Sequence, residues 1–151
     1  MKKLASFALA FALCAACAVP VLADETKATT IKASIPSSYT VVIPAETTIQ
    51  FNKLETKLEG PLYLSAAQLE PNHYVKISAT ANELTNDADK SKTIPFTLYA
   101  NNSSFDSATF TDTKKQVQLS VHITKDAWAK ASAGNYTGSV TFTITYASKG
   151  G

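Results

Sequence analysis

The chain has 151 residues, 14 lysines, no arginine and 12 acidic residues, so its formal charge is close to zero. Arginine is preferred for bidentate contacts with phosphate, and proteins that charge holds on nucleic acid carry a basic surface. The composition therefore excludes nucleic acid as a partner. The hydrophobic content of 45% is enough for one packed domain.

The first residues have the composition of a secretory signal peptide. Lys2 and Lys3 precede an apolar run over residues 4–19, and the small residue Ala23 stands just before an acidic pair. We predict a signal peptide over residues 1–23, with cleavage after Ala23. The product is a single secreted or cell-surface domain, residues 24–151, without a membrane span.

Two other kinds of leader fit the sequence less well. A membrane anchor needs about 20 apolar residues, whereas this run is short and Pro20 interrupts it. A lipoprotein signal at Cys17 would need a leucine-like residue three positions earlier, where Cys14 stands. Both cysteines of the chain fall in the leader, so the exported domain is expected to be stable without disulfides, as is common on bacterial surfaces.

Short segments with alternating apolar and polar residues follow one another along the rest of the chain. Such alternation predicts strands with one face on a core and the other in water. The expected strands cover residues 30–35, 39–43, 47–51, 62–66, 73–81, 94–100, 116–124 and 134–146. The last is the most regular, with Tyr136, Val140, Phe142, Ile144 and Tyr146 on its apolar face.

The intervening segments predict loops and one helical turn. Polar residues dominate 54–60, 82–92 and 101–113, and in the last of these Phe105 and Phe110 are expected to pin a loop to the core. Residues 125–131 are the helical turn. About eight strands, turns at short spacing and no long helix predict an all-β fold, an antiparallel β-sandwich.

The segment from Trp128 to Tyr146 resembles the closing part of bacterial secreted immunoglobulin-like domains. The residues that carry this resemblance are Ala-Gly-Asn-Tyr-Thr-Gly followed by Val-Thr-Phe-Thr-Ile-Thr. Such domains include surface, adhesin-like and pilin-like proteins of Gram-positive bacteria. The resemblance implies an immunoglobulin-like sandwich with a tyrosine corner: Tyr136 bonds back to the preceding turn, Gly134 supplies an unusual backbone angle, and Trp128 packs over one end of the core.

Residues for catalysis are few. His73 and His122 are the only imidazole bases, and the alternation places both on solvent faces. No cysteine follows residue 17, and no serine lies in a Gly-x-Ser-x-Gly turn. We therefore predict that the protein is not an enzyme and uses no cofactor.

The run Asn86-Asp87-Ala88-Asp89 has the alternating oxygen ligands of a calcium loop. It lacks the glycine turn and the distal glutamate of such loops, and Lys90 and Lys92 would repel a cation. We predict a solvated loop here and no metal site.

Two modes of binding remain open for a structural or adhesive module, whose partners are other surface proteins, copies of itself, or glycans. Outward-facing Tyr63, Tyr74 and Tyr99 are the candidate glycan contacts of a carbohydrate-binding module. The alternative for these tyrosines is packing against neighbouring side chains of a half-buried sheet.

The second mode uses the N-terminal segment. Ile31, Ala33 and Ile35 lie on one face of an extended stretch over residues 26–35, which is suited to completing the sheet of a neighbour. The alternative is that this strand pairs within its own sandwich. Deleting residues 24–35 separates the two hypotheses.

Overall fold

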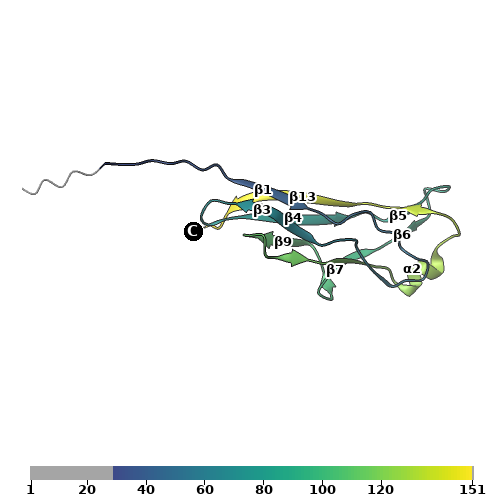
Figure 1. Cartoon of the computed structure of the whole chain (residues 1–151). Helices are drawn as coiled ribbons and strands as arrows, with labels where there is room; N and C mark the ends of the chain where they lie inside the picture. The colour runs from purple at the N-terminus through teal and green to yellow at the C-terminus, as the bar shows by residue number, and fades with distance from the viewer. Residues whose placement is uncertain (1–28, 151) are drawn as a thin grey trace, which may run out of the picture. The chain divides into compact units, whose positions relative to one another are not determined.

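Figure 1 shows the computed structural model, which describes residues 29–150. The predicted signal peptide, residues 1–23, lies outside the described residues. The chain divides after Ser34 into two units, and the second holds all the described strands and the helix α2 (Lys125–Lys130). Among the described residues, no helix has the length and apolar content of a membrane span.

The fold is all-β, as predicted, and every strand pair is antiparallel. The strands are β1 (Ser38–Val42), β2 (Glu55–Lys57), β3 (Leu62–Gln68), β4 (His73–Ala81), β5 (Leu84–Asn86), β6 (Thr93–Ile94), β7 (Thr97–Ala100), β8 (Ser103–Ser104), β9 (Ser107–Phe110), β10 (Gln116–Val117), β11 (Leu119–His122), β12 (Tyr136–Thr137) and β13 (Val140–Ser148).

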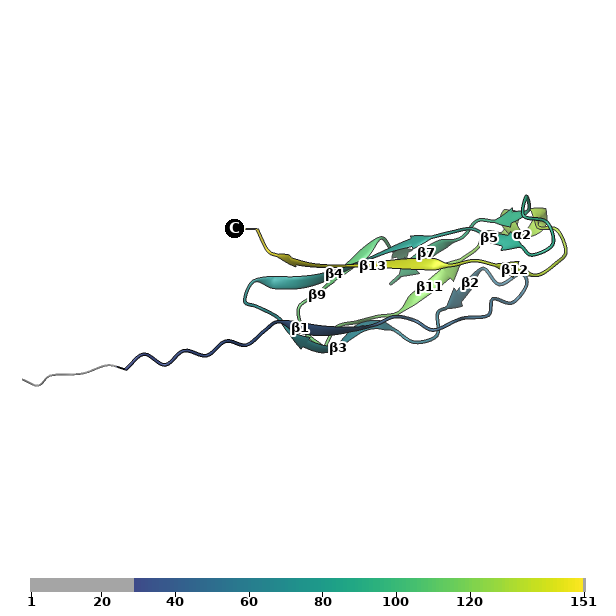
Figure 2. The same cartoon turned by 90° about the horizontal axis from the view of Figure 1, so that it is seen from above.

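The strands form four small sheets, which combine into two layers. The sheet orders are β1-β3-β10, β2-β11-β7-β8, β12-β5-β6 and β13-β4-β9. Only Gln118 separates β10 from β11, so the first two sheets share one extended segment. Two-residue gaps likewise join β4 to β5 and β12 to β13. Figure 2 shows β4 and β13 in one layer of this sandwich and β1 and β3 in the other.

The core lies between the two layers. Leu62 and Leu64 of β3 are fully buried, and so are Val75 and Ile77 of β4. These pairs are two residues apart in their strands, so each pair points to one face of its sheet. The remaining buried hydrophobic residues are Ile94, Leu98, Phe105, Ala108, Phe110, Leu119, Val121 and Ile123.

All three of the expected loops contain strands. Phe110 does not pin a loop from outside: it is fully buried in β9, where it pairs with Val75. The predicted loop over 82–92 contains β5, and β2 forms where residues 54–60 were expected to be a loop.

Two expected strands do not form. Residues 47–51 are irregular, and Phe51, expected to point inward, is 73% exposed. Single hydrogen bonds fix this stretch: Ala45 donates to the Glu59 carbonyl over 2.7 Å, and the Glu59 amide donates to Thr47 Oγ1 over 2.9 Å. Residues 30–35 are not in a strand either.

Candidate functional site

The end of the sandwich near α2 is fixed by hydrogen bonds to backbone carbonyls. The helix begins after Thr124, whose side chain accepts from the Ala127 amide over 3.1 Å as an N-cap. Trp128 Nε1 donates to the Lys53 carbonyl over 2.9 Å, and its ring meets that of Phe51 edge-on at 5.6 Å. The Trp128 ring packs partly buried against the core.

Tyr136 lies six residues after the end of this helix, at the start of β12. Its hydroxyl donates to the Ser132 carbonyl, four residues earlier, over 2.9 Å. A tyrosine hydroxyl bonded to the backbone a few residues upstream is also a feature of the tyrosine corner of immunoglobulin-like domains. The bond fixes the chain between α2 and the two strands that close the sandwich.

We expect Tyr136→Phe to lower the free energy of unfolding by about 1 kcal/mol, the usual contribution of one such hydrogen bond. Phenylalanine keeps the ring and loses only the donor to Ser132. Urea denaturation of both proteins measures the change. An unchanged midpoint would contradict a stabilising role for this bond.

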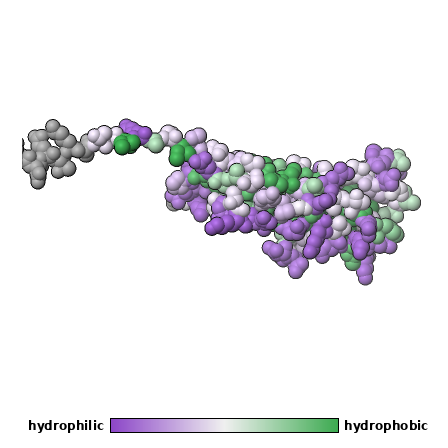
Figure 3. Space-filling model, in the orientation of Figure 1, coloured by the Kyte–Doolittle hydropathy of each residue, from purple (hydrophilic) through white to green (hydrophobic). Residues whose placement is uncertain are grey.

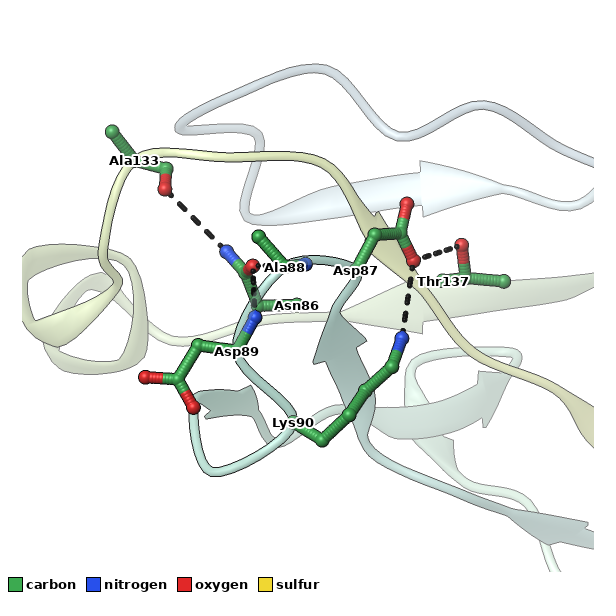
Figure 4. Close-up of polar contacts among 7 residues, drawn as sticks. All are labelled: Asn86, Asp87, Ala88, Asp89, Lys90, Ala133 and Thr137. Atoms are coloured by element: carbon green, nitrogen blue, oxygen red, sulfur yellow. Dashed lines mark hydrogen bonds and ion pairs between the residues drawn. The ribbon is translucent and has the colours of Figure 1, made fainter.

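Gly134 lies against the side chain of Asn86; Figure 4 shows this asparagine and its bond to the neighbouring Ala133. Gly134 has φ +145°, a conformation that other residues rarely adopt, and a Cβ there would collide with the Asn86 side-chain amide. Asn86 is 3% exposed, and its amide nitrogen donates to the Ala133 carbonyl over 3.4 Å. The segment from 133 to 134 therefore lies against a buried asparagine.

Asn86 also organises the acidic loop after β5. Its side-chain oxygen accepts from the amides of Ala88 (2.9 Å) and Asp89 (3.1 Å), an Asx-type turn. Asp87 accepts from Thr137 Oγ1 over 3.1 Å and lies 3.6 Å from Lys90 Nζ, as Figure 4 also shows. The Asn86 side-chain oxygen and one oxygen of the Asp87 carboxylate are therefore engaged with groups of the chain itself.

The carboxylate of Asp89 accepts from the hydroxyl (2.7 Å) and the amide (3.0 Å) of Ser91. These bonds to the charged form lower the pKa of Asp89 below its ordinary value, the side-chain bond contributing most. This interaction is complete above the ordinary pKa and is lost as the pH falls through the lowered one.

The three candidate glycan tyrosines lie in three different sheets, on β3, β4 and β7, and each is half-buried. Tyr63 and Tyr99 flank the segment formed by β10 and β11, whereas Tyr74 belongs to the sheet of β13. Tyr99 is stacked on His122 with ring centres 3.9 Å apart. The structure does not bring the three tyrosines together.

Both histidines stack on tyrosines and lie near glutamates. His122 Nε2 is 3.5 Å from Glu55 Oε1, and it is a buried atom without a hydrogen-bond partner. His73 stacks on Tyr146 with ring centres 5.1 Å apart and lies 3.7 Å from Glu70. Within residues 29–150, no three His, Cys, Asp or Glu side chains gather as metal ligands would.

A hollow lined by apolar and polar groups lies beside the corner, with a volume of about 770 Å³. Its aromatic wall consists of Phe51, Trp128 and Tyr136, and Glu46, Thr47 and Asn135 supply polar groups. This volume is within the range of about 300–1,000 Å³ that small-molecule sites occupy.

A second hollow of about 240 Å³ lies between residues 43–49 and the start of β13. Core side chains reach it from both layers, with Leu58 and Val121 on one side and Phe142 on the other. Figure 3 shows hydrophobic surface gathered along the upper edge of the view, where β13 lies in Figure 1. Core side chains are therefore accessible to solvent at this hollow, beside the start of β13.

The side chains of the predicted assembly strand are exposed. Ile31 is 90% exposed, Ile35 is 70% exposed, and Ala33 is exposed as well. The alternation thus presents apolar side chains that contribute nothing to the core.

Sequence reasoning missed the burial of Asn86 and the hollow beside β13. Asn86 was considered only as an oxygen ligand of a calcium loop, because it stands in a polar run. The hollow is built by residues from segments far apart in the chain, so no local pattern indicates it.

Neither a protein-family model nor a curated protein matches this chain.

Proposed function

We propose that the protein is a non-catalytic structural or adhesive module, secreted to the cell surface, that assembles by strand exchange through its N-terminal segment. The observation that carries the proposal is the exposure of Ile31 and Ile35, at 90% and 70%. Isoleucine exposed in this way on one side of an extended segment is suited to pairing with another sheet. The predicted signal peptide supports export.

Assembly is tested with the double variant Ile31→Asp/Ile35→Asp in the chain of residues 24–151. We expect wild-type oligomers, measured by size-exclusion chromatography with light scattering. The variant should need at least about a hundredfold higher concentration to assemble, because burying two unpaired carboxylates is strongly unfavourable.

The matched control is Thr30→Asp/Ser34→Asp, which adds the same charge on the opposite parity of the same segment. This control should assemble like the wild type. A wild-type chain that stays monomeric at all concentrations contradicts strand-exchange assembly.

The second candidate function is carbohydrate binding. The observation that favours it is the hollow lined by Phe51 and Trp128, with the amide of Asn135 on its wall, because sugars stack on aromatic rings and bond to amides. Under this alternative, the chain remains monomeric in the assembly experiment, and the wild-type protein binds to one or more immobilised sugars on a glycan array.

A further inference from the structure

Within residues 29–150, no strand pairs with the outer edge of β13. β13 is the first strand of the order β13-β4-β9, so β4 pairs with one edge only. The Asn82 amide donates to the Ser139 carbonyl, and the Lys149 amide donates to the Asn72 carbonyl. Odd-numbered residues therefore face β4, and the backbone groups of Val140, Phe142, Ile144, Tyr146 and Ser148 point away from it.

This edge carries none of the usual protection. Exposed edges are commonly blocked by charged side chains, prolines or bulges. β13, Val-Thr-Phe-Thr-Ile-Thr-Tyr-Ala-Ser, contains no charge and no proline over nine residues, and its pairing with β4 has no register shift. The opposite edge of the same sheet differs, because Lys115 Nζ donates to the Thr109 carbonyl of β9 over 2.8 Å.

The side chains next to the edge are apolar and only partly covered. Ile144 is 43% exposed, and Val140 and Phe142 line the 240 Å³ hollow together with Ile43 and Ile49. Tyr39 stacks on Tyr146 at 5.8 Å and links the two layers at the far end of β13. The edge and the hollow thus form a groove with hydrogen-bonding groups on one wall and apolar side chains on its floor.

We infer that this groove is the acceptor in the proposed strand exchange, and that its occupant is the N-terminal segment of a second copy. The inference rests on the proposed function. Residues 29–35 extend over about 23 Å and β13 over about 30 Å, at about 3.3 Å per residue. Ile31, Ala33 and Ile35 fill the hollow, while Thr30, Lys32 and Ser34 face solvent.

A second copy fits better than the same chain. Only Pro36 and Ser37 separate Ile35 from β1. A two-residue hairpin turn favours residues with positive φ, whereas the ring of proline holds φ at a negative value. Tyr39 near the start of β1 stacks on Tyr146 near the end of β13. The segment would therefore have to reverse at Pro36 and Ser37 to run back along its own β13, which favours a neighbouring molecule as the occupant of the groove.

Ile144→Pro tests the acceptor edge. Proline removes an outward amide and keeps the odd-numbered bonds to β4, so the variant should fold but assemble at least about a hundredfold less readily. The matched control is Thr109→Pro on β9. Ala79 donates to the Asp106 carbonyl, so Thr109 also points its amide away from β4. This control should assemble normally.

Complementation makes the test decisive. The donor variant Ile31→Asp/Ile35→Asp keeps its groove, and Ile144→Pro keeps its N-terminal segment. Each should be monomeric alone, whereas their mixture should form a one-to-one heterodimer and nothing larger, measured by light scattering with one chain tagged.

The outcomes separate the two proposals. Monomeric wild type overturns both. Wild-type oligomers that disappear in the donor variant but persist in Ile144→Pro overturn the groove as acceptor and leave strand exchange standing. If Ile144→Pro does not fold, Ile144→Lys replaces it, since a charge at this partly exposed edge position should prevent pairing equally well. Normal assembly of Ile144→Lys overturns the inference.

Discussion

Gly134→Ala is expected to lower the free energy of unfolding by about 2–6 kcal/mol. Alanine is strained at φ +145°, which costs about 1–3 kcal/mol. Its Cβ would also collide with the Asn86 side-chain amide, and displacing that amide weakens buried hydrogen bonds at a further cost of about 1–3 kcal/mol. Urea denaturation followed by circular dichroism measures the loss.

Gly60→Ala is the matched control. Gly60 also has a positive φ, +82°, but no atom lies within 4 Å of a Cβ placed there. This variant should show the backbone strain alone, about 1–3 kcal/mol. Equal losses for the two variants would contradict the role of Asn86 at Gly134.

Asn86→Ala is expected to cost about 2–4 kcal/mol. The side chain is 3% exposed and bonds to the amides of Ala88 and Asp89 and to the Ala133 carbonyl. Alanine leaves these part-buried groups without their partner, at about 1–3 kcal/mol for each one that water cannot reach. Thermal or urea denaturation measures the effect.

Asn82→Ala is the control for this asparagine. Asn82 is exposed, and its side chain makes one hydrogen bond, of 3.1 Å, to Ser139 Oγ. Its replacement should change stability by no more than about 0.5 kcal/mol. The double variant Asn86→Ala/Gly134→Ala should lose less than the two single losses combined, because the collision disappears with the amide. Strict additivity would show that the two residues do not interact.

The strands that the sequence predicts best are those that carry large apolar residues in unbroken alternation. β4 spans residues 73–81 as predicted, and the predicted helical turn over 125–131 corresponds to α2. The predicted strand over 134–146 is divided into β12 and β13, and β13 continues to Ser148. β9 was missed because its inward residues are Ala108 and Phe110, and one small residue beside one large one gives a weak alternation in a polar stretch. The expected strand over 47–51 fails for a different reason. The Thr47 hydroxyl bonds to backbone groups, and such side-chain bonds compete with the pairing of a strand.

The candidate site was less accessible to sequence reasoning. Alternation shows which side chains of an extended segment share a face, but not which strand will pair with it, so residues 30–35 read like an ordinary strand. The burial of Asn86 depends on residue 133, which is 47 positions away in the chain. Contacts over such distances follow from the tertiary fold and leave no local pattern.

The long ladder between β4 and β13 has a mechanical consequence for a chain of joined molecules. Nine residue pairs in register, from Val140 with Ala81 to Ser148 with His73, connect the two strands. Tension that enters through a strand bound along the outer edge of β13 is spread over these pairs. Each pair then carries a fraction of the pulling force, so such a fibre should resist stretching far better than the strength of any single hydrogen bond suggests.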